Sequence, residues 1–147
     1  MKKGYLLLLL GAIPAVGFGA LAVLNPTNVA ETSETSEILP TRHYKTDLQN
    51  FVAETEKIIP TISTYGQSWR VMESKTENNS ATIKVEVPVL FFTDDLEIKA
   101  NPDKEKNEIT VNLRSASRVG KSDLGENQRH ILQFLNALDK KFEQNRQ

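Results

Sequence analysis

The sequence predicts an α+β fold: a two-layer sandwich of about four antiparallel strands flanked by an N-terminal and a C-terminal helix. Apolar residues recur at helical spacing around residue 50 and again around residue 135. Between these segments they alternate with polar residues, which is the pattern of strands with one buried face. Helices with one apolar stripe and a sheet with one apolar face bury those surfaces by packing together, so this order of elements favours helices over one face of a sheet.

Residues 1–24 are typical of a signal peptide or of an uncleaved transmembrane anchor. Two lysines precede residues 5–24, a stretch without any charge. Ala20-Leu21-Ala22 has the small-x-small form of a cleavage site. A stretch of about 20 residues is also long enough to span a bilayer as a helix, so cleavage and retention both stay open. Either outcome places the rest of the chain on the extracytoplasmic side of a membrane, secreted or anchored.

Residues 25–43 are predicted to be a flexible linker, which leaves residues 44–147 as the α+β domain. Thr, Ser, Glu and Pro dominate the linker, and its few apolar side chains cannot offset the entropy lost on ordering it.

Composition excludes several classes of site. The chain has no cysteine, which excludes disulfides, thiol catalysis and zinc–thiolate sites. Its formal net charge of −1 gives no electrostatic basis for binding nucleic acid. No G-x-S-x-G nucleophile motif occurs, and no cofactor is predicted.

The first helix is predicted to begin at Thr46 and to end before Pro60. Thr46 as N-cap and Gln49 three residues later have capping-box spacing. The residue before a proline avoids the helical region, so Pro60 ends the helix. The apolar stripe consists of Leu48, Phe51, Val52, Thr55, Ile58 and Ile59.

The strands follow, separated by polar turns at residues 77–80 and 101–107. Alternation is clearest from Ile83 to Phe91, where every second residue is apolar. Pro88 cannot donate to a ladder, so this strand lies at an edge or is bulged there. The other apolar positions of the strands are Trp69, Val71, Leu96, Ile98, Ile109, Val111 and Leu113.

The last helix begins after Asp123, an N-cap that forms a capping box with Glu126. His130 lies beside its apolar stripe and is expected to be a solvated or boundary residue. The stripe consists of Ile131, Phe134, Leu135, Leu138 and Phe142.

Two polar segments form the candidate ligand-binding region. One is Thr93-Asp94-Asp95, which interrupts the hydrophobic run of a strand. The other extends from Arg114 to Arg129, where a strand ends, a loop rich in Ser and Gly follows, and a capped helix begins. The candidate residues are Asp94, Asp95, Arg114, Ser115, Ser117, Arg118, Lys121, Asn127 and Arg129.

These segments resemble the signature of the domain of unknown function 1499 family. The resemblance covers most of Tyr44 to Phe142. It rests on FTDDLE from Phe92 and on VNLRSASRVGKSDLGENQRHI, in which the matching positions are Asp94, Asp95, Glu97, Arg114, Ser115, Ser117, Arg118, Gly120, Asp123, Gly125, Asn127 and Arg129. The family implies no assigned chemistry. Its members occur in bacteria and photosynthetic lineages, often with a hydrophobic N-terminus, which implies a cytoplasmic or thylakoid membrane for the leader to cross. The cysteine-bearing segment of many members is missing here.

A structural interpretation of the candidate residues is a polar network. Asp94 and Asp95 would pair with Arg114 and Arg118, and thereby hold the last two strands to the final helix. The remaining polar side chains, Ser115, Ser117 and Asn127, would satisfy backbone groups of the loop.

Functional interpretations are anion binding and metal binding. Arg118, Lys121, the serine hydroxyls and the N–H groups at the helix start could hold a phosphate, sulfate or carboxylate. Asp123 opposes this, because a capping carboxylate already occupies the positive helix end. Asp94, Asp95 and Glu97 offer hard oxygens for Mg²⁺ or Ca²⁺. Successive strand residues point to opposite faces, however, so no metal site is predicted without a bulge.

The sequence as a whole favours a non-catalytic, membrane-associated extracytoplasmic domain that binds or assembles with a protein partner or a small ligand. An anchor and a spacer are present, and catalytic motifs are not. Two alternatives stay open: an enzyme or binder that acts on an anionic ligand through residues 114–129 and Asp94/Asp95, and a carrier of an apolar ligand between the sheet and the helices.

Overall fold

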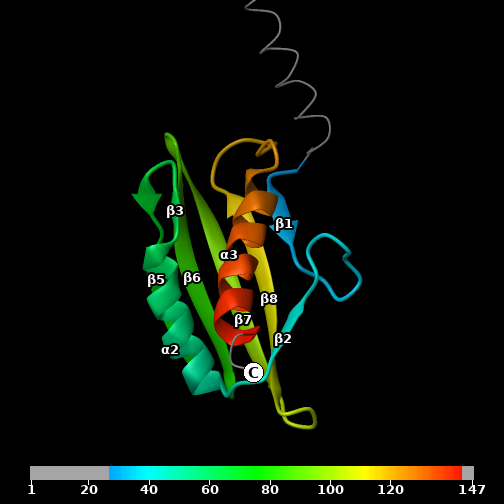
Figure 1. Ribbon diagram of the computed structural model, residues 1–147. Coiled ribbons are helices and arrows are strands. Elements are labelled where there is room, and N and C mark those ends of the chain that lie inside the picture. Colours follow the sequence, from blue (N-terminus) through cyan, green and yellow to red (C-terminus); the bar gives the residue numbers. More distant parts are fainter. Residues whose placement is uncertain (1–26, 144–147) are drawn as a thin grey trace, which may run out of the picture.

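A computed structural model of the chain describes residues 27–143 (Figure 1). The predicted leader, residues 1–24, lies outside this range. No helix within residues 27–143 is long and apolar enough to cross a membrane. The elements are β1 (Val29–Glu31), β2 (Arg42–Tyr44), α2 (Leu48–Ile58), the 3₁₀ turn η1 (Ile59–Thr61), β3 (Ser63–Thr64), β4 (Gln67–Ser68), β5 (Arg70–Glu77), β6 (Ser80–Val89), β7 (Phe92–Asp103), β8 (Glu108–Ser117) and α3 (Glu126–Glu143).

The fold is α+β, but the predicted sandwich of about four strands between two terminal helices is wrong. The described chain contains eight strands, and six of them form one antiparallel sheet in the order β1-β8-β7-β6-β5, with β2 also paired to β8. The strands β3 and β4 form a separate two-stranded hairpin. Two strands precede α2, the first helix within residues 27–143, so that helix does not open the domain.

The segment 25–43, predicted to be a flexible linker, contains β1 and most of β2. Both strands pair with β8, β1 near its end and β2 near its start. Residues 32–41 form the loop between these two strands (Figure 1). The hydroxyls of Thr32 and Thr41, at its two ends, donate to Oδ1 of Asn112 at 3.3 and 2.7 Å. Pairing with an existing strand edge therefore orders a segment whose own apolar burial would not suffice.

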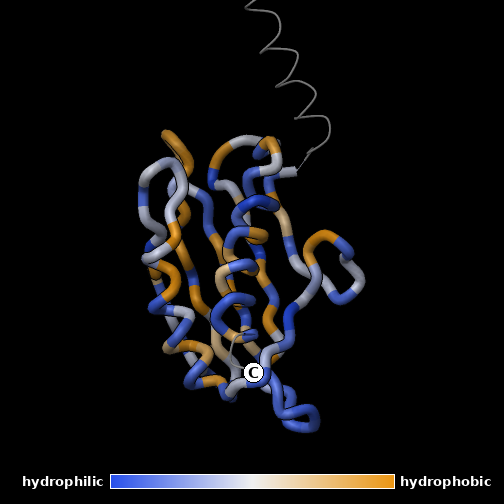
Figure 2. Tube along the Cα trace, in the orientation of Figure 1, coloured by the Kyte–Doolittle hydropathy of each residue, from blue (hydrophilic) through white to orange (hydrophobic). Residues whose placement is uncertain are grey.

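Both helices lie over one face of the large sheet, and the core fills the space between the two layers (Figure 1). Apolar residues alternate along β6, β7 and β8, and those that face the helices are buried (Figure 2). Among the largest fully buried side chains are Trp69, Tyr44, Phe51 and Phe134. Every buried core residue of the described chain lies between Leu39 and Phe142, so a fragment of residues 26–147 retains this core.

Side-chain carboxylates cap both helices. The N-cap of α2 is Asp47, one residue after the predicted Thr46, and its carboxylate accepts the backbone N–H of Asn50 at 2.8 Å. Before α3 the carboxylate of Asp123 accepts the backbone N–H groups of Gly125 and Asn127 at 2.9 and 2.7 Å. The helix itself begins at Glu126, and the Glu126 carboxylate contacts Tyr65 and Arg129 instead of closing the predicted capping box. Asp123 thereby fixes the start of α3 at the end of the sheet where the candidate site lies.

Candidate functional site

A cavity of about 430 Å³ opens at one end of the sheet, between the turn that joins β6 to β7, the segment that follows β8, and the first turn of α3. This volume lies in the range of small-molecule sites. The apolar part of its wall consists of Val89, Leu90, Phe92, Val119 and Leu124, and its polar lining includes Tyr65, Asp94, Glu126 and Arg129.

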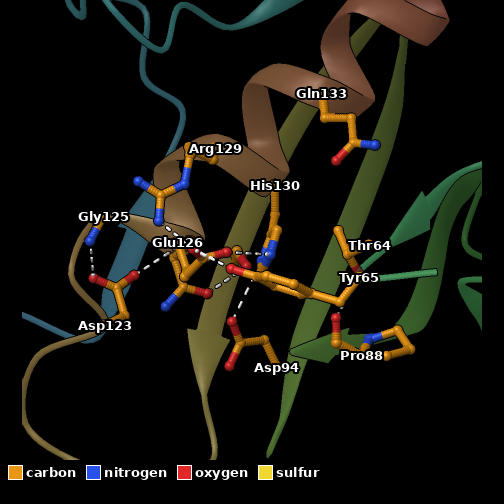
Figure 3. A network of polar contacts seen from close by, with 12 residues as sticks. Thr64, Tyr65, Pro88, Asp94, Asp123, Gly125, Glu126, Arg129, His130 and Gln133 are labelled. Carbon is orange, nitrogen blue, oxygen red and sulfur yellow. Dashed lines mark hydrogen bonds and ion pairs between the residues drawn. The ribbon is translucent and has the colours of Figure 1, made fainter. Parts of the chain in front are cut away.

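A buried histidine between two carboxylates lies beside this cavity (Figure 3). Asp94 is on the core-facing side of β7, and its Oδ2 lies 3.3 Å from Nδ1 of His130 on α3. The other ring nitrogen, Nε2, lies 3.3 Å from Oε2 of Glu126, four residues earlier on the same helix. Only 1% of the His130 side chain and 3% of the Asp94 side chain are exposed. His130 is therefore not the solvated or boundary residue that the sequence predicts.

The contacts between these groups are close approaches without well-aligned hydrogen bonds. Oδ2 of Asp94 and both ring nitrogens of His130 are buried and have no partner with hydrogen-bond geometry. The rings of His130 and Trp69 lie nearly perpendicular to each other, with centroids 5.9 Å apart. Because each ring nitrogen faces a carboxylate, the imidazole has no lone pair directed at the cavity, and it positions the two acids rather than acting on a ligand.

Tyr65 completes the polar floor of the cavity from the β3–β4 hairpin. It lies in the two-residue turn Tyr65-Gly66, where both φ angles are positive, and this turn directs its ring toward α3 (Figure 3). Its hydroxyl donates to Oε1 of Glu126 at 2.9 Å. This hydrogen bond, followed by burial and by the charge of Glu126, raises the pKa of Tyr65. Arg129 also contacts Oε1 of Glu126.

The predicted candidate residues divide between the two faces of the sheet. On the outer face Asp95, Arg114 and Arg118 surround a depression of about 330 Å³. Nη2 of Arg118 lies 2.6 Å from Asp95 and 3.1 Å from Glu86, and Nε of Arg114 lies 2.8 Å from Glu31. The hydrogen bonds to Asp95 contribute most to raising the pKa of Arg118. The predicted pairing of Asp95 with Arg118 is present, whereas Asp94 contacts His130 instead of an arginine.

On the inner face three candidate residues form a buried network beneath α3. The hydroxyl of Ser115 donates to Oδ1 of Asn127 at 2.5 Å. The amide nitrogen of Asn127 donates to Oγ of Ser117 at 2.9 Å and to the carbonyl of Asn28 at 2.8 Å. These side chains bind one another and the start of the domain, which is a structural role. Lys121 is exposed in the loop between β8 and α3.

Within residues 27–143 the candidate residues do not come together as an anion-binding site or as a metal site. Asp94 and Asp95 point to opposite faces, as strand alternation predicts, and no cluster of acidic or histidine side chains suited to a metal ion occurs within residues 27–143. The carboxylate of Asp123 accepts N–H groups from Gly125 and Asn127, so the helix start that an anion would use is already capped. The candidate residues predicted from the sequence did not include Tyr65 and Glu126, which line the cavity, or His130, which lies beside it.

The fold and the site together define a class: a small antiparallel α+β domain with an acid-floored apolar cavity at one end of its sheet. The family model described as "Protein of unknown function (DUF1499)" matches residues 21–138. The chain belongs to this family. Searches of curated proteins and of solved structures returned no match.

Proposed function

We propose that this chain is an extracytoplasmic, membrane-associated binding module, and that its cavity takes an amphipathic ligand. The ligand has an apolar body and a head group that carries positive charge or donates hydrogen bonds. The observation that carries this proposal is the apolar wall of the cavity beside two carboxylates, that of Asp94, which is buried, and that of Glu126, whose side chain is 18% exposed. The localisation rests on the leader, residues 1–24, by its sequence alone.

The charges around the cavity favour a cationic head over an anionic one. Asp94, Asp123 and Glu126 contribute three carboxylates to its lining, and Arg129 contributes the one cation among the described lining residues. Arg129 is already paired with Glu126. An ammonium or another donor group would supply a hydrogen-bonding partner to carboxylate oxygens, which are acceptors only when ionised.

The same arrangement does not favour an enzyme. Both nitrogens of His130 face carboxylates, and Glu126 is shared among His130, Arg129 and Tyr65. A general base needs a free acceptor within reach of the proton that it removes. These contacts instead hold the floor of the cavity in one geometry, which is what a binding site requires.

Three probes with the same ten-carbon chain test the proposal: decylamine, decanol and decanoate, titrated below their micellar concentrations into residues 26–147 by calorimetry. We expect decylamine to bind most tightly and decanoate most weakly. A charge-assisted hydrogen bond contributes about 1.5–3 kcal/mol, which corresponds to at least tenfold between the amine and the alcohol.

A matched pair of variants assigns the selectivity to the cavity. Glu126→Gln keeps the shape of the side chain and removes its charge, and it should weaken decylamine binding with little effect on decanol. Glu97→Gln makes the same change on β7 beside Lys99, remote from the cavity, and should leave both affinities unchanged. Tightest binding of decanoate would overturn the assignment of the head group, and no binding of any probe would overturn the function.

A further inference from the structure

Four large apolar side chains are exposed on the two loops that border the cavity: Leu90, Phe91, Phe92 and Val119, here called the apolar tip. Their exposed fractions are 58%, 95%, 56% and 59%. Leu90 and Phe91 form the turn between β6 and β7, and Val119 lies in the segment after β8. The two loops lie at the same end of the molecule, and both are hydrophobic at their tips (Figure 2).

The cavity does not account for the whole apolar tip. Leu90, Phe92 and Val119 line it, whereas Phe91 does not. A ligand that filled the cavity would therefore still leave the Phe91 ring in water. Contiguous exposed apolar side chains of this kind mark contact with a protein or a membrane.

The backbone of the turn adds a second observation. Val89 pairs with Phe92, so Leu90 and Phe91 form a two-residue hairpin turn in which Leu90 has a φ of 48°. Gly, Asn or Asp normally occupies such a position, because other side chains are strained there. The β5–β6 turn of this same chain follows that rule, with Asn78 and Asn79 at φ 49° and 60°. The chain thus accepts strain at Leu90 to present an apolar side chain, which points to a function for the turn.

The path of the chain indicates what the apolar tip contacts. The side-chain amide of Asn28 donates to the carbonyl of Gly120 at 2.8 Å, so the described chain begins next to the loop that carries Val119. Three residues lie between Asn28 and Leu24, the last residue of the apolar stretch 5–24, so four Cα–Cα steps join the two. Four extended residues span at most about 14 Å. A leader embedded in a bilayer would therefore hold the apolar tip close to the membrane surface.

We propose that the apolar tip inserts into the interfacial region of the bilayer, so that the mouth of the cavity faces lipid. Burial of apolar side chains in this region is the force that holds amphipathic surface elements on membranes. Lys121, exposed beside Val119, would lie at the level of the head groups, as cationic side chains at membrane surfaces do. This inference rests on the membrane association proposed above but not on the identity of the ligand.

The test uses the full chain reconstituted into vesicles of phosphatidylcholine and phosphatidylglycerol that contain a nitroxide-labelled lipid. Because the chain has no cysteine, a single introduced cysteine carries a fluorophore at one defined position. Val119→Cys places the fluorophore at the apolar tip. Lys104→Cys places it in the β7–β8 turn, at the opposite end of the sheet (Figure 1). We expect the nitroxide to quench the fluorophore at 119 and not at 104.

Two substitutions test whether the Phe91 ring contributes to membrane insertion. Phe91→Ser removes the most exposed apolar side chain, which has no contact with the cavity, and should lower the ratio of docked to undocked domain by about tenfold. The control, Ile38→Ser, removes an apolar side chain that is 62% exposed in the loop of residues 32–41, and should leave the quenching at 119 unchanged. Equal quenching at 119 and 104, no quenching at 119, or an emission change at 119 that depends on protein concentration without lipid would each overturn the proposal. The last result would indicate a second copy of the chain as the partner. None of these results would affect the calorimetric test of ligand binding, which contains no membrane.

Discussion

Replacing His130 with phenylalanine is expected to lower the free energy of unfolding by about 3–5 kcal/mol. The substitution keeps a planar ring beside Trp69 but removes both nitrogen atoms that face the carboxylates. Asp94, with only 3% of its side chain exposed, would then be buried without the ring nitrogen that faces it. The change at Glu126 should cost less free energy, because Tyr65 still donates to its carboxylate and Arg129 still contacts it.

The separation of the two groups supports this magnitude. A protonated imidazole ring and an ionised carboxylate 3.3 Å apart would attract by about 5 kcal/mol at an effective dielectric constant of about 20. Breaking a buried pair by removing one partner typically costs about 3–5 kcal/mol, since the charge left behind is not solvated.

A double-mutant cycle separates the pair from general damage to the core. Asp94→Leu combined with His130→Phe replaces two buried polar groups with apolar ones of similar size. The double variant should be more stable than the sum of the two single changes by about 3 kcal/mol. Urea unfolding followed by far-ultraviolet circular dichroism gives the four free energies without relying on Trp69 fluorescence.

The second histidine of the chain provides the control. The side chain of His43 is 32% exposed and contacts the carboxylates of Glu34 and Glu108. His43→Phe should cost less than about 1 kcal/mol, because partly exposed ion pairs contribute little. If His130→Phe cost no more than His43→Phe, or if the cycle gave a coupling near zero, the buried pair would not contribute to stability and our reasoning about the floor of the cavity would be refuted.

Three further predictions follow from contacts outside the cavity. Arg118→Ala should change the free energy of unfolding by about 1 kcal/mol or less in urea unfolding, because 45% of the Arg118 side chain is exposed; a loss above about 3 kcal/mol would show that the outer pairs behave as buried ones. Asn127→Ala should cost about 3 kcal/mol in the same assay, since it leaves the buried hydroxyl of Ser115 and a backbone carbonyl without their partner; a cost below about 1 kcal/mol would contradict this. Hydrogen bonds from Lys141 and then Lys57 lower the pKa of Glu54 from 4.5 to about 2, so its contribution to stability is present above about pH 4.5 and is lost as the pH falls toward 2. A carboxyl NMR titration should show that midpoint, and Lys141→Met should raise it; an unchanged midpoint in the variant would exclude Lys141 as the main cause.

The long elements could be predicted because each carries its own pattern. Alternation along β6, β7 and β8 places Ile83, Leu96 and Val111 in the core, and the helical stripe does the same for Phe134. At α3 the sequence correctly indicated Asp123 as an acceptor for N–H groups near the helix start, but not the start at Glu126. At α2 the cap was misplaced by one residue because Thr46 and Asp47 both have side chains that can cap.

The short strands could not be predicted, because their stability does not come from their own residues. The strands β1 and β2 are three residues each and depend on the edge of β8 for their hydrogen bonds. The hairpin of β3 and β4 has two residues in each strand, and the indole N–H of Trp69 donates to Thr64 within it at 3.2 Å. Pairing over such lengths leaves no periodic signal, and so the number of strands was underestimated.

The site was predictable only in part. Asp94 is in phase with the buried Leu96 and Ile98, which indicates a carboxylate on the core side of β7. Glu126 and His130 are four residues apart on α3, a spacing that places them on the same face of a helix. These two signals together could have identified the buried histidine. No local signal existed for Tyr65, because its approach to Glu126 depends on where the β3–β4 hairpin packs.

The pairing of β8 with both β1 and β2 also affects how copies of this domain coexist. The exposed edge of a sheet is a template for strand addition, and therefore for aggregation. Here β1 and β2 cover one edge along most of β8. The opposite edge, β5, has a register shift between Val71 and Glu73 and carries charged side chains at Arg70, Glu73, Lys75 and Glu77. Such irregular, charged edges resist pairing with another chain. Copies of the domain at high local concentration would thus remain separate sheets, with no tendency to join edge to edge into fibrils.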